Sequence, residues 1–294
     1  MLGKKISFFL FRVFIALFKI IPFWLLYRLS DFVYFIFFYI LSYRKNVVIK
    51  NLKKCFPEKS EQELKRLRKN FYKILSDIIL ETFKGFTMSK DELLKRFKVK
   101  ENNVAEKYFQ QGKDVIVLLG HFANWEWAIA SVVEKFNHHP AVLYKPISNQ
   151  LFDKYFRDKR GRYGAGLVSI YETRQYFMKE KPKPVMYYMG ADQYPPNKEK
   201  QKNATFFGTN TAFLNGPEKY ATQLNIPVIY LEIQRVKRGF YTMELMDVCE
   251  QPKDLTENEL TQMYASLLEK SIKKQPENWM WSHKRWKREL YSFD

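Results

Sequence analysis

A histidine and a glutamate five residues apart form the pattern in this sequence that is best suited to chemistry. His121 follows Gly120 directly, and Glu126 comes five residues after the histidine. A neutral imidazole can take a hydroxyl proton near pH 7, and a carboxylate on its other ring nitrogen fixes the tautomer and stabilises the imidazolium. The spacing therefore predicts a general-base pair in which Glu126 holds the ring of His121.

The elements expected around this pair would place it at the edge of a sheet. The short apolar run 115–119 is typical of a buried strand, and Asn124 can cap a helix that begins directly after it. His121 would then lie at the carboxyl end of a strand, where open α/β sheets bind ligands. A structural role is the alternative, because the helix dipole by itself favours an acid such as Glu126 in the first turn.

No serine or cysteine nucleophile accompanies the pair. The sequence has no Gly-x-Ser-x-Gly motif, and Cys55 and Cys249 lie in ordinary surroundings. A His/Glu pair without its own nucleophile would act on a hydroxyl that a substrate supplies. Two distant cysteines and four scattered histidines also argue against a disulfide scaffold or a metal site, so no metal ligands are assigned.

The composition is both basic and aromatic, which fits an anionic membrane surface or a nucleic acid. Lys and Arg total 50 against 31 acidic residues, a net charge of +19, and aromatic residues make up 17% of the 294 residues. Residues 6–42 favour the membrane, because they are overwhelmingly apolar and aromatic. Arg12, Lys19 and Arg28 interrupt them, so no unbroken apolar stretch of about 20 residues exists. The segment could lie in the membrane interface or span the bilayer, and a buried core helix is the alternative.

The rest of the chain alternates short apolar runs with helical stretches. This alternation predicts an α/β fold, a single domain with a mostly parallel central sheet flanked by helices, over residues 56–294. Residues 1–55 would form a preceding membrane-anchoring helical segment. The expected strands are 115–119, 141–144, 167–170, 185–189 and 227–233, the last paired with 240–248 in a hairpin. The expected helices are 46–55, 60–83 with a capping box at Ser60, 104–111, 124–137, 149–160, 171–180, 211–225 and 257–274, and 195–203 is the most loop-like stretch.

Further polar residues follow other predicted strands or end a helix. Lys145 and Asp192 each come shortly after a strand, so in a parallel sheet they would share one crevice with His121. Arg160 and Arg162 end a helix, where cations suit the helix dipole, but they could equally recognise a phosphate or an oxyanion.

Near the C-terminus, residues 279–286 interleave tryptophans with cations. This pattern fits a stacking platform for nucleic acid or an amphipathic element at a membrane-facing surface. We expect His283 within it to be structural.

Six motifs in order resemble those of the lipid A biosynthesis late acyltransferases, the lauroyl/myristoyl transferase group within the lysophospholipid acyltransferase superfamily. The resemblance extends from the N-terminal segment to about residue 288. The motifs are Gly-His-Phe-Ala-Asn-Trp-Glu at 120–126, Tyr-Lys-Pro-Ile-Ser-Asn at 144–149, Arg-Gly-Arg-Tyr-Gly at 160–164, Ala-Asp-Gln at 191–193, Thr-Phe-Phe-Gly-Thr at 205–209, and the run from Gln275 to Lys287.

The resemblance implies a membrane-bound O-acyltransferase of lipopolysaccharide synthesis on the cytoplasmic face of a Gram-negative inner membrane. Such an enzyme moves a fatty acyl chain from acyl carrier protein to a hydroxyl of a lipid A precursor, with no metal or organic cofactor. His121 and Glu126 occupy the family's catalytic positions, Arg160 or Arg162 that of an assisting arginine, and Asp192 falls on an acidic motif. The partners expected for the protein are acyl carrier protein, a lipid acceptor and an anionic membrane, with no nucleic acid.

Three alternatives remain open from the residues. The acceptor could be another lipid, such as an aminoacyl lipid, because nothing in the sequence selects chain length or acceptor. The same dyad could activate water in a lipid hydrolase. A non-catalytic basic protein that tethers nucleic acid to the membrane would instead show binding that weakens steeply with salt.

Overall fold

A computed structural model of the chain describes residues 2–133 and 135–290. In this part of the chain, seven strands form one sheet in the spatial order β1-β9-β8-β2-β5-β3-β4, and β6 and β7 form a separate hairpin. Every neighbouring pair in the large sheet is parallel except β8 and β9. The predicted α/β fold with a mostly parallel sheet is confirmed. The strands are β1 (Phe97–Val99), β2 (Val115–Leu119), β3 (His139–Tyr144), β4 (Gly166–Ser169), β5 (Val185–Gly190), β6 (Gln201–Phe206), β7 (Thr209–Leu214), β8 (Val228–Lys237) and β9 (Phe240–Cys249).

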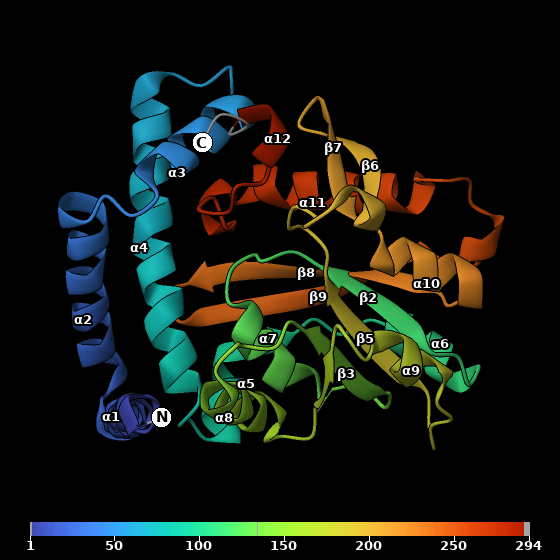
Figure 1. Cartoon of the computed structure of the whole chain (residues 1–294), viewed down its shortest axis with the longest axis horizontal. Coiled ribbons are helices and arrows are strands. Elements are labelled where there is room, and N and C mark those ends of the chain that lie inside the picture. Colours follow the sequence, from blue (N-terminus) through green and yellow to red (C-terminus); the bar gives the residue numbers. More distant parts are fainter. Residues whose placement is uncertain (1, 134, 291–294) are drawn as a thin grey trace.

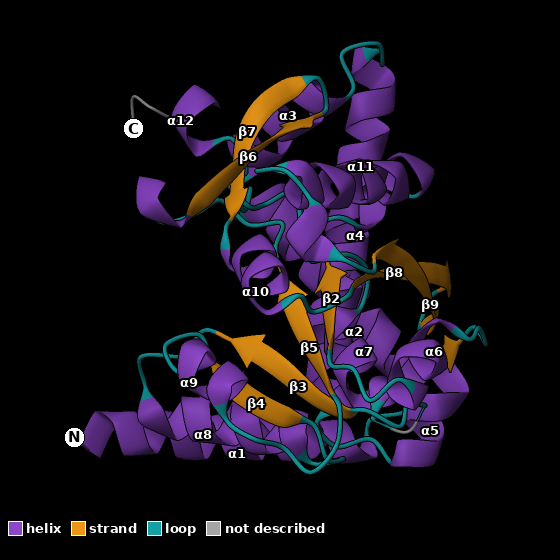
Figure 2. Cartoon of the chain, turned by 90° about the vertical axis from the view of Figure 1, so that its right-hand side faces the viewer, coloured by secondary structure: helices purple, strands orange, loops and turns teal. Residues whose placement is uncertain are grey.

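Helices cover both faces of the sheet. α10 and α11 lie on one side and α5, α7 and α8 on the other (Figure 1), and the view turned by 90° shows the same two layers (Figure 2). Because both faces are covered, all five side chains of β2 are apolar and buried. The helices are α1 (Leu2–Ile20), α2 (Phe23–Phe35), α3 (Lys45–Cys55), α4 (Glu61–Gly85), α5 (Lys90–Arg96), α6 (Val104–Gln110), α7 (Trp125–Val132), α8 (Gln150–Gly161), α9 (Thr173–Met178), α10 (Gly216–Leu224), α11 (Glu259–Lys274) and α12 (Lys287–Leu290).

The N-terminal helices pack against α4 rather than against the sheet. α4 begins at the predicted capping box, in which the Ser60 hydroxyl accepts from the Glu63 N–H and the Glu63 carboxylate accepts from the Ser60 N–H. α2 lies beside α4 (Figure 1) and buries one stripe of side chains at a spacing of four: Leu26, Ser30 and Tyr34. A π-helical turn, η1 (Ile36–Ile40), continues α2. α3 contributes to the main core, so the expected division near residue 55 stays a prediction.

The expected helix over 211–225 is wrong in its first part. β7 ends at Leu214 and pairs antiparallel with β6, and α10 begins only at Gly216. Phe207 and Gly208 connect the two strands with φ values of 48° and 69°, the left-handed conformations of a tight two-residue hairpin turn. The apolar residues of β7 are too few to distinguish a helical period from a strand period, which explains the error. The strand β1 was not expected either, because three residues show no period.

The tryptophan-rich segment near the C-terminus is part of the core. Trp279, Trp281 and Trp286 are at most 2% exposed. The Trp281 indole N–H donates to the Pro276 carbonyl at 2.6 Å. Both expected roles, a stacking platform and a membrane-facing element, are therefore wrong for these side chains. His283 fits its expected structural role, since its Nε2 accepts from the Tyr194 backbone N–H at 2.9 Å.

Candidate active site

The register of two adjacent strands brings His121 and Asp192 together. β2 and β5 are parallel neighbours with Leu119 opposite Gly190. His121 comes two residues after the end of β2, and Asp192 comes two residues after the end of β5. Both side chains therefore lie at the carboxyl edge of the sheet, where the sequence predicted a shared crevice.

Asp192 holds the imidazole of His121. Its Oδ1 lies 2.6 Å from His121 Nδ1, and its Oδ2 accepts from the His121 backbone N–H at 2.8 Å. The Trp279 indole N–H donates to the same Oδ2 at 2.9 Å. The Asp192 side chain is 2% exposed and the His121 side chain 25% exposed, so the carboxylate lies behind the ring and the ring faces outward.

The contact between His121 and Asp192 lowers the pKa of the carboxyl group and raises that of the imidazole. Burial raises the pKa of Asp192, but the His121 charge and the three hydrogen bonds outweigh burial and lower it to about 2. Burial is the largest single influence on the pKa of His121 and lowers it, but the Asp192 charge, the Asp192 hydrogen bond and the Glu126 charge together outweigh burial and hold that pKa above its usual value of 6.5. An ionised Asp192 accepts the proton of Nδ1, which leaves Nε2 as the basic nitrogen.

Small residues and an aromatic ring fix the position of the imidazole. A Cβ at Gly190 would lie 3.2 Å from His121 Cε1, so the absence of a side chain there leaves room for the ring. Trp125 contacts the imidazole edge-on with ring centroids 5.3 Å apart. On the open side, the Gln193 side-chain nitrogen lies 3.4 Å from His121 Nε2.

Glu126 binds Arg160 and does not hold the histidine ring, which corrects the expected pairing. It lies in the first turn of α7 as predicted, and Asn124 caps that helix by accepting from the Trp127 N–H at 3.0 Å. The Glu126 carboxylate forms a two-point ion pair with the Arg160 guanidinium, with Nε to Oε2 at 2.8 Å. The reason is tertiary: α8 packs against α7 and brings Arg160 to Glu126, while β5 supplies a nearer acid to the ring. The charges of Glu126 and Arg160 still act on the pKa of His121.

Arg162 lies away from this pair and caps α4. Its terminal nitrogens donate to the backbone carbonyls of Gly85, Phe86 and Met88, each at 2.7 Å. Gly85 and Phe86 end α4, where backbone carbonyls have no partner within the helix, and Met88 lies in the connection to α5. The geometry favours a structural role for Arg162 over a phosphate or oxyanion contact.

Lys145 follows β3 at the same edge of the sheet but points into solvent. Within residues 2–133 and 135–290 it forms no hydrogen bond or ion pair. The structure thus gathers His121, Asp192, Glu126 and Arg160, and it leaves Lys145 and Arg162 outside that group.

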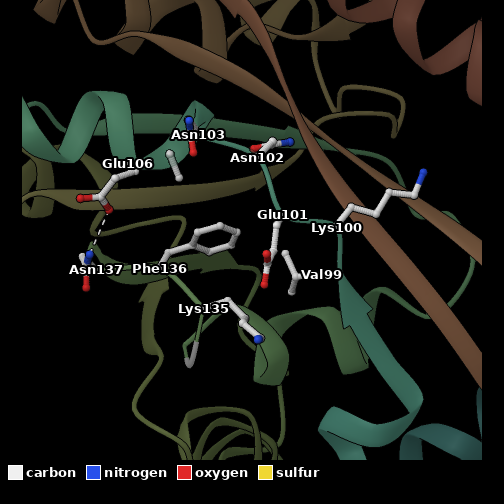
Figure 3. A pocket seen from close by; sticks show the side chains of 10 residues that line it. Val99, Lys100, Glu101, Asn102, Asn103, Glu106, Lys135, Phe136 and Asn137 are labelled. Atoms are coloured by element: carbon white, nitrogen blue, oxygen red, sulfur yellow. Dashed lines mark hydrogen bonds between the residues drawn. The ribbon is translucent and has the colours of Figure 1, made fainter.

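A hollow lies at the opposite edge of the sheet, away from His121. It measures about 600 Å³ and is lined by the loop after β1, including Lys100 and Asn102, and by the loop before β3, including Phe136 and Asn137 (Figure 3). Because β1 runs antiparallel to β2, its end lies where β2 begins, far from His121. Beside Glu126 and Arg160 the structure leaves a hollow of only about 20 Å³, room for one water molecule.

Comparison with known proteins identifies the family. The family model of the bacterial lipid A biosynthesis acyltransferases matches residues 2–288, nearly the whole chain. The chain belongs to this family. It is similar to a lipid A biosynthesis palmitoleoyltransferase of Escherichia coli strain K12, with 23% identity over 252 residues that cover 84% of this chain and 80% of that protein. A lipid A biosynthesis acyltransferase of Shigella flexneri matches with the same identity and coverage.

Membership of the lipid A biosynthesis acyltransferase family makes the chain an O-acyltransferase. The site contains what such a reaction needs, a base with a free nitrogen and a positively charged group close by. The two hydrogen-bonded pairs, His121 with Asp192 and Arg160 with Glu126, come from two loops and two helices at the edge of the sheet.

One loop of the acyltransferase is braced by the C-terminal segment, and sequence reasoning missed this. The backbone N–H of Met280 donates to the His121 carbonyl at 3.2 Å, and that of Ala123 donates to Asn278 at 2.8 Å. Ala123 has a left-handed φ of 49°, so the loop is sharply bent there. The hydrogen bond from the Trp279 indole to Asp192 could not be predicted from the sequence, although Trp279 lies within one of the family motifs.

Replacing Arg162 by alanine in the acyltransferase is expected to reduce stability by about 1–3 kcal/mol, because buried carbonyls at the end of α4 would lose their donor. Arg174 is exposed and serves as the matched control, for which we expect little change. Thermal unfolding of the two variants checks this. A normal melting temperature together with a raised Michaelis constant for the lipid acceptor would instead assign Arg162 to substrate binding.

Proposed function

We propose that this acyltransferase moves a fatty acyl chain from an acyl thioester, carried by acyl carrier protein, to a hydroxyl of a lipid A precursor. The observation that supports this most is the arrangement of His121. Its Nδ1 is bound to the buried Asp192 carboxylate, and its Nε2 is left as a base on the open side of the ring. Within the described residues the ring contacts Asp192, Gln193 and Trp125, and none of these is a serine, threonine or cysteine nucleophile, so the acceptor hydroxyl would itself attack the thioester.

In the proposed reaction His121 Nε2 takes the proton of the acceptor hydroxyl as its oxygen bonds to the thioester carbonyl carbon. The resulting oxyanion collapses, the carbon–sulfur bond breaks, and the imidazolium returns the proton to the leaving thiolate. Asp192 would stabilise the imidazolium between the two proton transfers, the role that the sequence predicted for Glu126. Glu126 would orient Arg160 by their two-point ion pair.

Arg160 would stabilise the developing oxyanion. Glu126 holds one edge of its guanidinium through Nε and a terminal nitrogen, and 21% of the Arg160 side chain is exposed. A charge fixed in place before the reaction lowers the barrier because nothing must reorganise as the oxyanion forms. The ion pair with Glu126 also leaves the two side chains with no net charge, which suits a hydrogen-bond donor better than a clamp for a phosphate dianion.

Arg160→Ala is therefore expected to lower the turnover number by about 10²–10³-fold with little change in the acceptor's Michaelis constant. Lysine at this position should restore part of the rate if a point charge suffices. Titrating the acceptor at saturating donor checks this. A raised Michaelis constant with turnover maintained would mean that Arg160 holds a lipid phosphate in the ground state.

The proposed location of the enzyme is the cytoplasmic face of the inner membrane of a Gram-negative cell. Two observations support attachment to an anionic bilayer. The stretch Phe23–Ile40 has the length and composition of a membrane helix, and only 17% of it is buried. The net charge of +19 would attract both a phosphorylated lipid and an acidic carrier protein.

Mass spectrometry tests the proposed function directly. Purified full-length protein is incubated with an acyl carrier protein thioester and a lipid A precursor that bears a free hydroxyacyl hydroxyl. We expect the acceptor to gain the mass of one fatty acid minus one water, and membrane lipids from cells without the gene to lack one acyl chain. Release of free fatty acid without any acylated lipid would overturn the proposal in favour of a hydrolase.

A further inference from the structure

Helices α1 and α2 and the turn η1 share a continuous apolar outer surface. Most of the exposed large apolar side chains in the described residues lie in this segment, before residue 44. We define the apolar face by these side chains: Ile6, Phe9, Leu10, Val13, Phe14, Leu17, Ile20, Trp24, Leu29, Phe32, Phe35, Tyr39, Ile40, Leu41 and Tyr43.

The chemistry around the apolar face fits the boundary layer of a lipid bilayer. Arg12, Lys19 and Arg28 are exposed along the same helices, where their long side chains can reach lipid phosphates. The exposed Trp24 and Tyr39 are of the types that gather at membrane interfaces. An apolar surface flanked by cations and aromatic residues of this kind is suited to an anionic bilayer surface.

The opposite side of α2 is tied to the body of the protein by charged groups. Ser30 donates to Asp77 at 2.6 Å, and Tyr27 donates to Glu81 at 3.0 Å. Asp31 forms an ion pair with Arg238 at 2.7 Å, and Arg238 also binds Asp77. Asp77 and Glu81 are buried, so pulling α2 away from α4 would leave both carboxylates without these partners.

These ties are incompatible with a spanning orientation. Asp31 lies in the middle of the stretch Phe23–Ile40. If α2 crossed the bilayer while docked, Asp31 and Arg238 would lie at its centre, and the tip of the β8–β9 hairpin would be drawn into hydrocarbon. Such a position is costly for charges that water reaches in the present structure, where Asp31 is exposed.

The direction of α1 leads to the same conclusion. α1 is seen end-on at the foot of α2 in Figure 1 and lengthwise in Figure 2, so it runs across α2 and does not continue it. α1 packs on α8 through aromatic pairs. The ring centroids of Phe8 and Phe152 lie 5.4 Å apart, and those of Phe11 and Phe156 lie 6.0 Å apart. α8 is the helix that carries Arg160, so α1 packs directly on one of the helices that form the candidate active site.

We infer that α1, α2 and η1 lie flat in the interfacial layer of one bilayer leaflet, so that the chain does not cross the membrane. This inference rests on the membrane attachment that is part of the proposed function. It adds that residue 5, the apolar face and the catalytic body are all on one side, with the active site opening beside the leaflet that holds the lipid acceptor.

The side of the membrane on which α1 lies can be measured by thiol labelling. Full-length protein with Cys249→Ser retains only the buried Cys55, and Lys5→Cys or Lys219→Cys then adds one exposed thiol. Lys219 lies on α10 in the body and serves as the matched control. A membrane-impermeant maleimide is applied to inside-out and right-side-out inner-membrane vesicles. We expect both thiols to react in the inside-out vesicles alone.

A depth measurement provides an independent check. Trp24→Cys, Phe32→Cys and Tyr39→Cys lie on the exposed side of α2 and η1 and each carries a fluorophore for quenching by brominated lipids. We expect the same shallow depth at all three positions in vesicles of phosphatidylethanolamine and phosphatidylglycerol. A Lys5→Cys thiol that reacts from the side opposite Lys219→Cys, or a fluorophore at residue 32 near the bilayer centre, would overturn the inference. Acyl transfer measured in the same vesicles distinguishes this failure from failure of the proposed function.

Discussion

Replacing His121 by alanine is expected to lower the rate of acyl transfer by about 10²–10⁴-fold, the usual contribution of a positioned general base. The fold should persist, because the ring is partly exposed and Asp192 keeps its hydrogen bonds from the His121 backbone N–H and the Trp279 indole. Single-turnover kinetics with a saturating thioester donor measures the loss. His139→Ala, which removes a histidine at the start of β3, is the matched control and should transfer normally.

The pH dependence of the wild-type rate follows from the same residue. His121 acts as a base only when it is neutral, and Asp192 holds its pKa above 6.5. The rate should therefore rise as pH increases through that raised pKa. The stability contributed by the His121 charge runs the other way: it is fully present below about 6.5 and is lost as pH rises through the pKa of the folded state. A near-normal rate in His121→Ala would remove the general base from the proposed mechanism.

Asp192→Asn tests the same pair from the other side. This variant is expected to lower the rate of acyl transfer by about 10²–10⁴-fold, because an amide can neither fix the tautomer of His121 nor stabilise the imidazolium. Without the carboxylate, burial would dominate the pKa of His121, and the acid limb of the pH–rate profile should move to lower pH. Glu126→Gln should shift that limb less, because Glu126 binds Arg160 and not the ring. If Glu126→Gln moved the limb as far as Asp192→Asn, the ring would be held by Glu126 as its spacing first suggested.

Asp192 also links the site to acid stability. Its pKa falls from 3.8 to about 2 on folding. A depressed carboxyl pKa contributes stability above the unfolded value, here about 2 kcal/mol, which is lost as pH falls from about 4 towards 2. Acid unfolding of the wild type and Asp192→Asn should therefore converge in this range, and parallel curves down to pH 2 would contradict the assignment.

A flat N-terminal segment explains why so apolar a stretch carries Arg12, Lys19 and Arg28. In a spanning helix these charges would be buried in hydrocarbon, whereas in the interface they reach the phosphates. The same segment also has an inner side, formed by Leu26, Ser30 and their neighbours, that packs on α4. The sequence left open whether this segment is a core helix or a membrane element. The inner side of α2 fits the first description and its outer side fits the second.

Local chemistry in the sequence determined the elements that carry the candidate catalytic residues His121 and Glu126. The run 115–119 is apolar in every position, so it forms a strand whose faces are both covered, and His121 must follow it. Asn124 caps α7 because its side chain can accept from a free N–H of the first turn, and this places Glu126 in that first turn. Both features depend on neighbours within a few residues, which is why the sequence alone predicts them.

Only the tertiary structure decided which acid holds which base. Asp192 lies 71 residues after His121 and meets it because β2 and β5 pair in parallel with one particular register. A spacing of five residues places Glu126 near the ring. The packing of α8 on α7, however, brings Arg160 to Glu126, and the two side chains form an ion pair. The tryptophans near residue 280 are buried for a similar reason: their segment packs on the loop after β2, about 150 residues earlier in the chain, and no local pattern of charge and aromaticity contains that information.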